Sequence, residues 1–232
     1  MNALHVISFS STNYYLLKCN DGFLLIDAGW VGKYEKFKKG LGALGIGVDS
    51  IKYILLTHHH HDHAALVQNI RSETSCRIIV HQDEVKFIRQ GTTFTGDMRQ
   101  FNIWLKLLDT CTSPFIRLNY NPVMLNKDDI IVSDNDYDLC GLTGLKARVI
   151  HTPGHSKGSI SLLLENGDSF VGDVAMNILR VFGQRQRPIE AEDYNDVYRS
   201  WQKLIHSGAK MVYPSHGRSF PVKELIRILE TI

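Results

Sequence analysis

The chain has 232 residues, of which 44% are hydrophobic and 22% charged, and its 26 basic and 24 acidic side chains leave a formal net charge of +2. This composition excludes disordered and fibrous proteins, and the balanced charge disfavours a nucleic-acid or membrane-surface partner. The four cysteines form no C-x-x-C pair, no apolar run approaches the roughly 20 residues of a membrane helix, and the first residues show no signal-peptide pattern. We therefore expect one cytoplasmic domain, residues 1–232.

The first third of the chain is predicted to consist mainly of strands. Short apolar or alternating runs predict strands at residues 4–9, 14–18, 23–26, 51–56 and 77–80. Asn20-Asp21-Gly22 is typical of a hairpin turn between two of them. Helices are predicted at residues 34–44 and 64–71.

The middle of the chain, around residues 91–122, is predicted to be a helical insertion lying over the site. Apolar residues recur there at helical spacing, at Met98, Phe101, Leu105 and Leu108. An ordinary core helix explains the same spacing equally well.

Strands return in the last part of the chain. They are predicted at residues 129–132, 145–150, 160–164, 169–171 and 211–213. Asp193 is expected to cap a helix that ends at Gly208, and Pro221 to open a last helix at its first position. The order of elements predicts an α/β fold of two similar halves, with two sheets face to face and helices outside.

Histidine is the unusual residue of this sequence. There are 11 histidines, and four of them stand together in the run from Thr57 to His63, between a predicted strand and a predicted helix. Side-by-side histidines are costly when buried, and a divalent cation offsets that cost by accepting their neutral nitrogens. The alternative is an exposed turn that binds metal adventitiously.

Three more segments place metal-ligand residue types at the ends of predicted strands. They are His151-Thr152-Pro153-Gly154-His155, Gly172-Asp173 and His216-Gly217. Four such coincidences in order favour a built metal site over an adventitious turn.

These motifs resemble those of the metallo-β-lactamase-fold superfamily of metal-dependent hydrolases. The family's T-H-x-H-x-D-H motif matches residues 57–63, its T-P-G-H matches 152–155, and its G-D, H-G and early D-x-G match 172–173, 216–217 and 27–29. The resemblance runs from about residue 5 to 220. It implies a four-layer αββα sandwich.

The resemblance also implies two metal sites. His58, His60 and His155 would bind the first ion, Asp62, His63 and His216 the second, and Asp173 would bridge them. The other residues near the motifs are expected to be supporting ones: His59 and His61 pointing away, His151 behind the ligands, and Asp27 hydrogen-bonded to the ligand loop. His5, His81 and His206 have no motif context and are expected to be ordinary surface or core histidines.

The implied activity is hydrolysis by a hydroxide that two metal ions share. Asp62 could orient this nucleophile or receive its proton. Zinc is the expected metal, with iron or manganese as alternatives, and the substrate is expected to be a small-molecule ester, thioester, lactone or phosphodiester. The antibiotic-hydrolysing relatives carry a cysteine at the position of Asp173, and the lactonases carry a tyrosine at that of Met176, which disfavours both activities.

Two other readings stay open at this point. One is an iron-dependent oxidoreductase acting on a sulfur compound, and the other is a non-catalytic protein that binds a small molecule. Arg180, Arg185 and Arg187 could contact a phosphate or carboxylate, although a solvated basic loop is the simpler expectation. No nucleic-acid or membrane partner is expected, and the sequence does not specify an oligomeric state.

Overall fold

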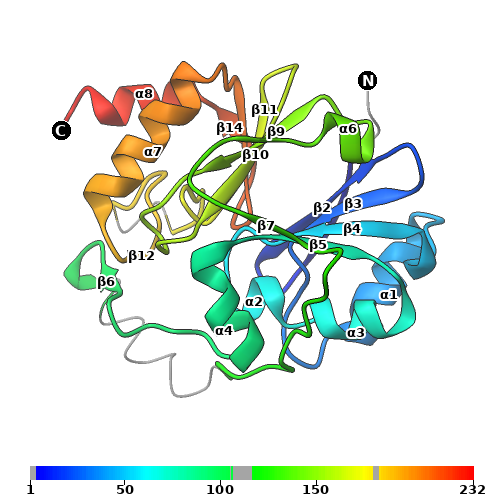
Figure 1. Ribbon diagram of the computed structural model, residues 1–232. Coiled ribbons are helices and arrows are strands. Elements are labelled where there is room, and N and C mark those ends of the chain that lie inside the picture. Colours follow the sequence, from blue (N-terminus) through cyan, green and yellow to red (C-terminus); the bar gives the residue numbers. More distant parts are fainter. Residues whose placement is uncertain (1–3, 105, 107–116, 180–182) are drawn as a thin grey trace.

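The structure is a computed structural model that describes residues 4–104, 106, 117–179 and 183–232. Two six-stranded sheets face each other, and helices cover their outer faces (Figure 1). The predicted four-layer αββα fold is therefore confirmed.

The first sheet has the strand order β1-β2-β3-β4-β5-β7. Its strands are β1 (Leu4–Phe9), β2 (Thr12–Lys18), β3 (Phe23–Ile26), β4 (Ile51–Leu55), β5 (Arg77–His81) and β7 (Ile130–Val132). The helical elements of this half are α1 (Tyr34–Ala43), α2 (His61–Ala64), α3 (Val67–Glu73), α4 (Val85–Gln90) and the 3₁₀ turns η1 (Val48–Ser50) and η2 (Gln82–Glu84).

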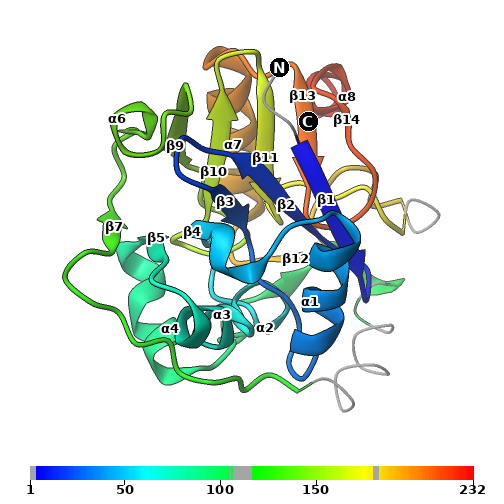
Figure 2. The ribbon, with the colours of Figure 1, turned by 90° about the vertical axis from the view of Figure 1, so that its right-hand side faces the viewer.

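The second sheet has the order β14-β13-β11-β10-β9-β8. Its strands are β8 (Tyr137–Asp138), β9 (Ala147–His151), β10 (Ile160–Leu164), β11 (Asp168–Gly172), β13 (Met211–Pro214) and β14 (Phe220–Pro221). The helices α7 (Tyr194–His206) and α8 (Lys223–Leu229) cover its outer face, and α6 (Cys140–Thr143) lies at its edge (Figures 1 and 2). A separate pair joins β6 (Arg99–Gln100) to β12 (Glu190–Ala191).

Three apolar layers hold the four layers together. In β3, Leu24 and Ile26 face the second sheet, whereas Leu25 faces the helices of the first half. In β10, Leu162 faces the first sheet and Leu163 faces α7. The alternation of side chains along a strand therefore explains why these runs are apolar on both faces.

Helix α7 begins and ends where the sequence predicts. The Asp193 carboxylate accepts hydrogen bonds from the backbone N–H groups of Asn195 (2.7 Å) and Asp196 (3.3 Å), and Gly208 lies just after the C-cap residue Ser207 at φ 98°. Trp201 is fully buried, and its indole N–H donates to the carbonyl of Val174 at 2.8 Å. The helix thereby fixes the backbone next to Asp173.

Three predicted helices differ from the structure. In the insertion at 91–122, no helix begins at Met98, because Arg99 and Gln100 pair with β12. This long-range pairing overrides the local helical periodicity. The other two residues of the expected apolar face, Leu105 and Leu108, lie outside the described residues. The helix predicted at 64–71 is divided into α2 and α3, since the N–H of Leu66 donates to the carbonyl of Ala28.

Pro221 lies in β14 rather than at the start of the last helix, which begins at Lys223, because residues 220–221 pair with β13. Within the described ranges, no helix has the length and apolar character to cross a membrane.

Candidate metal centre

All the residues proposed as ligands from the sequence lie at the ends of strands. The run from Thr57 to His63 follows β4, His155 follows β9, Asp173 follows β11 and His216 follows β13. β3 and β4 are parallel neighbours, as are β11 and β13, so the carboxyl ends of the strands in each pair meet at one edge. The facing sheets bring these two edges together.

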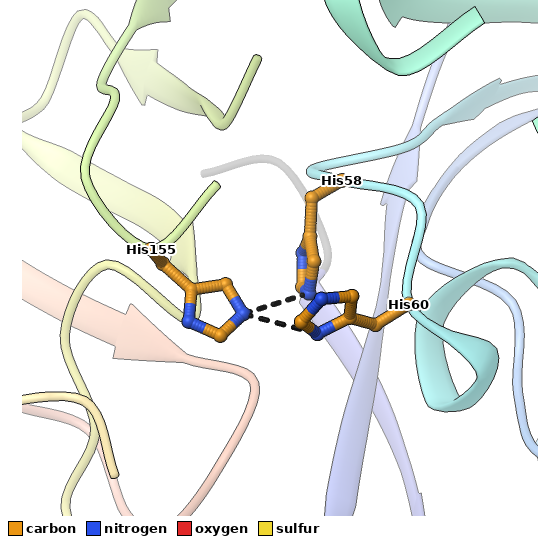
Figure 3. Close-up of side chains that lie close together, drawn as sticks. All are labelled: His58, His60 and His155. Atoms are coloured by element: carbon orange, nitrogen blue, oxygen red, sulfur yellow. Dashed lines mark hydrogen bonds between the residues drawn. The ribbon is translucent and has the colours of Figure 1, made fainter. Parts of the chain in front are cut away.

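Three histidines form one half of the centre, here called the three-histidine cluster: His58, His60 and His155. The His155 Nε2 atom lies 3.2 Å from His58 Nε2 and 3.2 Å from His60 Nδ1 (Figure 3). All three side chains are buried. Their ring nitrogens therefore point at one small volume from two different sheets.

Asp62, His63 and His216 form the other half, the mixed cluster. The Asp62 Oδ2 atom lies 3.1 Å from His216 Nε2 and 3.4 Å from His63 Nε2. Asp173 stands between the two clusters.

The position of Asp173 is defined by one oxygen atom. Its Oδ2 is 3.3 Å from the Nε2 atoms of His63 and His216, 3.7 Å from His155 Nε2 and 4.0 Å from His58 Nε2. A single carboxylate oxygen thus faces both groups of histidines.

The two clusters differ in charge. Burial lowers the pKa of His58 and His60 well below the usual histidine value, so these rings are neutral. Burial also lowers the pKa of His216, but Asp173 and Asp62 outweigh it and raise the pKa to about 10. In the mixed cluster the carboxylates therefore attract positive charge, whereas the three-histidine cluster offers neutral nitrogens.

The residues present fit a pair of divalent cations. Two atoms of the ligand set, His63 Nε2 and Asp173 Oδ1, are buried and have no hydrogen-bond partner. In a protein interior such orphaned atoms are costly, and neutral imidazole with carboxylate is the ligand set that zinc and related ions take. The geometry groups the residues in the same way, as sets of ligand atoms within 4.8 Å of one another.

Three of the inward-facing imidazoles are held from behind. His58 Nδ1 contacts Thr57 Oγ1 at 3.0 Å, His155 Nδ1 contacts the Glu190 carbonyl at 2.9 Å, and His216 Nδ1 contacts the Ser11 carbonyl at 3.0 Å. Such contacts fix the ring orientation and the tautomer that leaves Nε2 to a metal.

Asp27 holds the mixed cluster and the ligand loop at once. Its carboxylate contacts His63 Nδ1 at 2.8 Å and accepts from the Thr57 N–H at 2.8 Å and from Ser215 Oγ at 3.1 Å. The residue is fully buried and has a φ of 60°, a left-handed conformation that aspartate tolerates better than most residues. The expected hydrogen bond from Asp27 to the ligand loop is present.

Asp27→Asn should weaken metal binding by about 10- to 100-fold, the usual cost of losing a partner behind a metal-binding histidine. Competition between the protein and a chromophoric zinc chelator measures this affinity. Asp21→Asn, in the turn before β3, is the matched control and should bind as the wild type does. Equal affinities for Asp27→Asn and wild type would show that Asp27 does not support the site.

His59 points away from the centre, as expected, into a buried network. Its backbone N–H donates to Glu84 Oε2 at 2.8 Å, its Nδ1 makes a short contact with the same oxygen, and its Nε2 accepts from the Phe94 N–H at 3.1 Å. The other Glu84 oxygen accepts from Ser156 Oγ and the Gly158 N–H, both at 2.9 Å. Glu84 therefore ties the loop of His58 and His60 to the loop of His155.

Glu84→Gln should destabilise the fold by roughly 3 kcal/mol at neutral pH, because the amide nitrogen cannot accept the buried hydrogen bonds. Burial raises the pKa of Glu84, but its hydrogen bonds with His59 and Ser156 lower it by more, so the folded-state pKa lies below the usual value. The stabilisation is then present at neutral pH and is lost as the pH falls through that pKa. The gap between wild type and Glu84→Gln, measured by denaturant unfolding, should shrink in acid.

The exposed Glu165→Gln is the control for this charge change, and it should alter stability little at any pH. The role given to Glu84 would be contradicted if Glu84→Gln were as stable to unfolding as the wild type at neutral pH, or if the difference in unfolding free energy grew on acidification.

Two glycines of the motifs permit close approach of the loops. A Cβ on Gly154 would lie 2.3 Å from the backbone nitrogen of Val197, and a Cβ on Gly172 would lie 2.6 Å from Thr57 Cβ. Their φ values are 132° and 55°. Gly154 therefore lets the loop that carries His155 pack against α7, and Gly172 lets the loop that carries Asp173 pack against the histidine run.

Other residues near the motifs have different places from those expected. His151 does not lie behind the ligands; it contacts Asp134 and stacks on His81, which is buried. Arg180 lies outside the described residues and Arg185 is exposed. Arg187 is buried, donates from Nε to the Tyr198 hydroxyl at 2.8 Å and covers Phe101, so it is not part of a solvated loop.

Several supporting residues have no motif of their own. Thr12 Oγ1 donates to Asp62 Oδ2 at 3.3 Å and accepts from the Trp30 indole N–H at 2.9 Å. Glu84 lies just after β5, at the same edge of the sheet as the histidine run, and this position is a sequence signal for a supporting role. Thr12 and Trp30 carry no such signal in the sequence.

Comparison with known proteins gives a consistent family. A family model described as the metallo-beta-lactamase superfamily matches residues 7–216. The beta-lactamase-like protein 2 homolog of Drosophila melanogaster is 25% identical over 91% of this chain, which spans 60% of that protein's length. A probable metallo-hydrolase of Bacillus subtilis (strain 168) is 26% identical over 93% of the chain and 69% of its own length.

Solved structures show the same fold. A metallo-beta-lactamase family protein from Thermus thermophilus has a TM-score of 0.70 and 22% identity, covering 98% of this chain and 78% of that one. An archaeal metallo-beta-lactamase superfamily protein from Sulfolobus tokodaii has a TM-score of 0.67 and 21% identity, covering 100% of this chain and 86% of that one.

Proposed function

Because the chain belongs to the metallo-beta-lactamase superfamily, we propose that it is a hydrolase whose centre holds two divalent metal ions, with zinc as the preferred ion. The observation that carries the proposal is the convergence of five imidazoles and two carboxylates, with Asp173 Oδ2 facing both clusters. His58, His60 and His155 are assigned to one ion and Asp62, His63 and His216 to the other. Asp173 is assigned to both.

When bound, a pair of such ions makes hydroxide available near neutral pH and polarises the bond under attack. The chain's own contribution is to keep the ligands in place, with the outward nitrogen of three imidazoles held at a hydrogen-bond acceptor so that the inward nitrogen can bind an ion. Thr57, Ser11 and the Glu190 carbonyl do this for His58, His216 and His155.

Asp62 is assigned a second task, that of orienting the nucleophile or receiving its proton. Its Oδ2 faces His216 and His63, and Thr12 donates to the same oxygen. Burial raises the pKa of Asp62, but His63 and His216 lower it by more, so the carboxylate is ionised at neutral pH and can accept a hydrogen bond.

The substrate class we propose is a small-molecule ester, thioester, lactone or phosphodiester. Trp30 is half-buried, donates a hydrogen bond to Thr12, which in turn donates to Asp62, and packs its indole edge-on against His61, so we assign it to an aromatic wall of the substrate site. An apolar wall next to metal ligands suits the acyl part of an ester or thioester. The lactone class lacks support from Met176, which is buried and apolar.

The test is a panel of ester, thioester, lactone and phosphodiester substrates on protein whose metal content has been measured. We expect turnover of at least one class, loss of activity on chelation and recovery when zinc is restored. Iron in the purified protein with oxygen uptake on a thiol, and no hydrolysis across the panel, would instead favour an oxidoreductase.

A further inference from the structure

A second group of metal-ligand side chains lies away from the seven-residue centre. His81 is the last residue of β5, His151 is the last residue of β9, and Asp134 lies on the segment between β7 and β8. That segment carries the chain from the first sheet to the second (Figure 1). We call these three residues the sheet-junction cluster, because each comes from a different element where the two sheets meet.

Their ligand atoms face one another. Asp134 Oδ1 lies 3.2 Å from His81 Nε2 and 3.6 Å from His151 Nδ1, and the three atoms lie within 4.8 Å of one another. The two imidazole rings are stacked, with their centroids 4.3 Å apart and their planes 6° from parallel. His81 is fully buried, whereas the Asp134 side chain is 72% exposed, so the cluster has an inner wall and an open side.

The hydrogen bonds around the cluster direct the lone pair of one imidazole, that of His151, at the carboxylate, and leave His81 Nε2 without a hydrogen bond. His151 Nε2 contacts the Lys157 carbonyl at 2.9 Å, which places the proton of a neutral ring on Nε2 and leaves the lone pair of Nδ1 directed at Asp134. The Asp83 N–H donates to His81 Nδ1 at 3.3 Å, which places the proton of a neutral His81 ring on Nε2; this buried atom lies 3.2 Å from Asp134 Oδ1 but makes no hydrogen bond. A lone pair that faces a carboxylate repels it unless a cation lies between them.

We propose that His81, Asp134 and His151 bind a third divalent transition-metal ion of the zinc type, separate from the hydrolytic centre. Two imidazoles and one carboxylate form a ligand set that such ions take, with the remaining positions open to water. The stacked rings must tilt toward each other for both nitrogens to reach one ion. The His81 proton then moves to Nδ1, and the ring gives up its long 3.3 Å contact with the Asp83 N–H.

An ion at this position would brace both ligand loops of the centre. His81 precedes η2, the turn that carries Glu84, and Glu84 is bonded to His59 and Ser156. His151 stands four residues before His155 on the same stretch of chain. The proposal does not depend on the hydrolytic function, because its three ligands are distinct from the seven residues of that centre.

Zinc binding by Asp134→Asn tests the proposal with little risk to folding, since the side chain is largely exposed. Asp136→Asn is the matched control: the same charge change on the same segment, at a residue that pairs with Arg148 and Lys203 rather than with the cluster. Metal-free proteins are titrated with zinc in equilibrium dialysis, and bound zinc and thermal midpoints are measured at each concentration.

At micromolar free zinc, we expect the wild type and Asp136→Asn each to bind one zinc ion more than Asp134→Asn does. If Asp134→Asn still binds that ion, its affinity should be at least 10-fold lower. The thermal midpoints of the two binding proteins should rise as that last ion binds. His58→Ala should keep this ion, which separates the cluster from the seven-residue centre. Equal zinc binding by the wild type and Asp134→Asn, in number and affinity, would overturn the proposal even if the protein hydrolyses its substrate normally.

Discussion

Asp173→Asn is expected to lower metal occupancy in both clusters and to reduce turnover by more than the roughly 100-fold that loss of a supporting partner costs. The reason is that Asp173 Oδ2 lies 3.3 Å from His63 and from His216 and 3.7 Å from His155, so one substitution removes an oxygen that faces both clusters. Zinc content after dialysis, measured beside the turnover rate, gives the result.

Asp168→Asn, at the other end of β11, is the control for the same change in charge and size. It should keep both ions and wild-type turnover. If Asp173→Asn lost one ion and kept the other at full affinity, the carboxylate would belong to one cluster only and would not bridge them.

His58→Ala should abolish turnover and remove the ion of the three-histidine cluster, while the mixed cluster keeps its own. His58 Nε2 lies 3.2 Å from His155 Nε2, and no other imidazole of the described chain is placed to take over that position. Metal analysis and turnover on the same samples measure both effects.

The neighbouring His59 is an informative control because its contacts are of another kind. His59→Ala breaks the buried network with Glu84 and leaves a cavity beside Phe87, so it should destabilise the fold by about 3 kcal/mol. Below its lowered unfolding temperature, it should still bind both ions. Equal metal loss in His59→Ala and His58→Ala would show that the assignment of alternate histidines is wrong.

Patterns that lie within one stretch of chain predicted the fold well. The strands at residues 4–9, 23–26 and 160–164 have the bounds expected from apolar runs, and Asp193 caps α7 as expected. These elements depend on nearest neighbours and on burial, both of which leave a local pattern. The four-layer arrangement followed from the order of elements and from the family resemblance.

Features made by distant residues were not predicted. The pairing of Arg99–Gln100 with Glu190–Ala191 joins segments far apart in the chain, and it replaced part of an expected helix. Glu84 contacts His59 and Ser156 only through the folded arrangement. The sheet-junction cluster unites His81, Asp134 and His151 from three elements, and of these only His151 stands in a motif segment, where a different place was expected for it.

The candidate ligand residues could be proposed from the sequence because their spacing is local, whereas the contacts that hold them are not. Thr57 to His63 and Thr152 to His155 are short motifs that a sequence displays directly. Their supports come from segments that only the packing of the two sheets brings near, such as Thr12 beside Asp62. A sequence pattern therefore identifies candidate ligands well, but it does not identify the groups that orient those ligands.

Anomalous diffraction from crystals of the zinc-reconstituted protein shows directly whether the seven residues hold two ions. We expect two zinc peaks within the seven-residue centre, one bound by His58, His60 and His155 and the other by Asp62, His63 and His216, with Asp173 in contact with both. A centre with a single ion, or zinc bound only outside these side chains, would contradict this expectation.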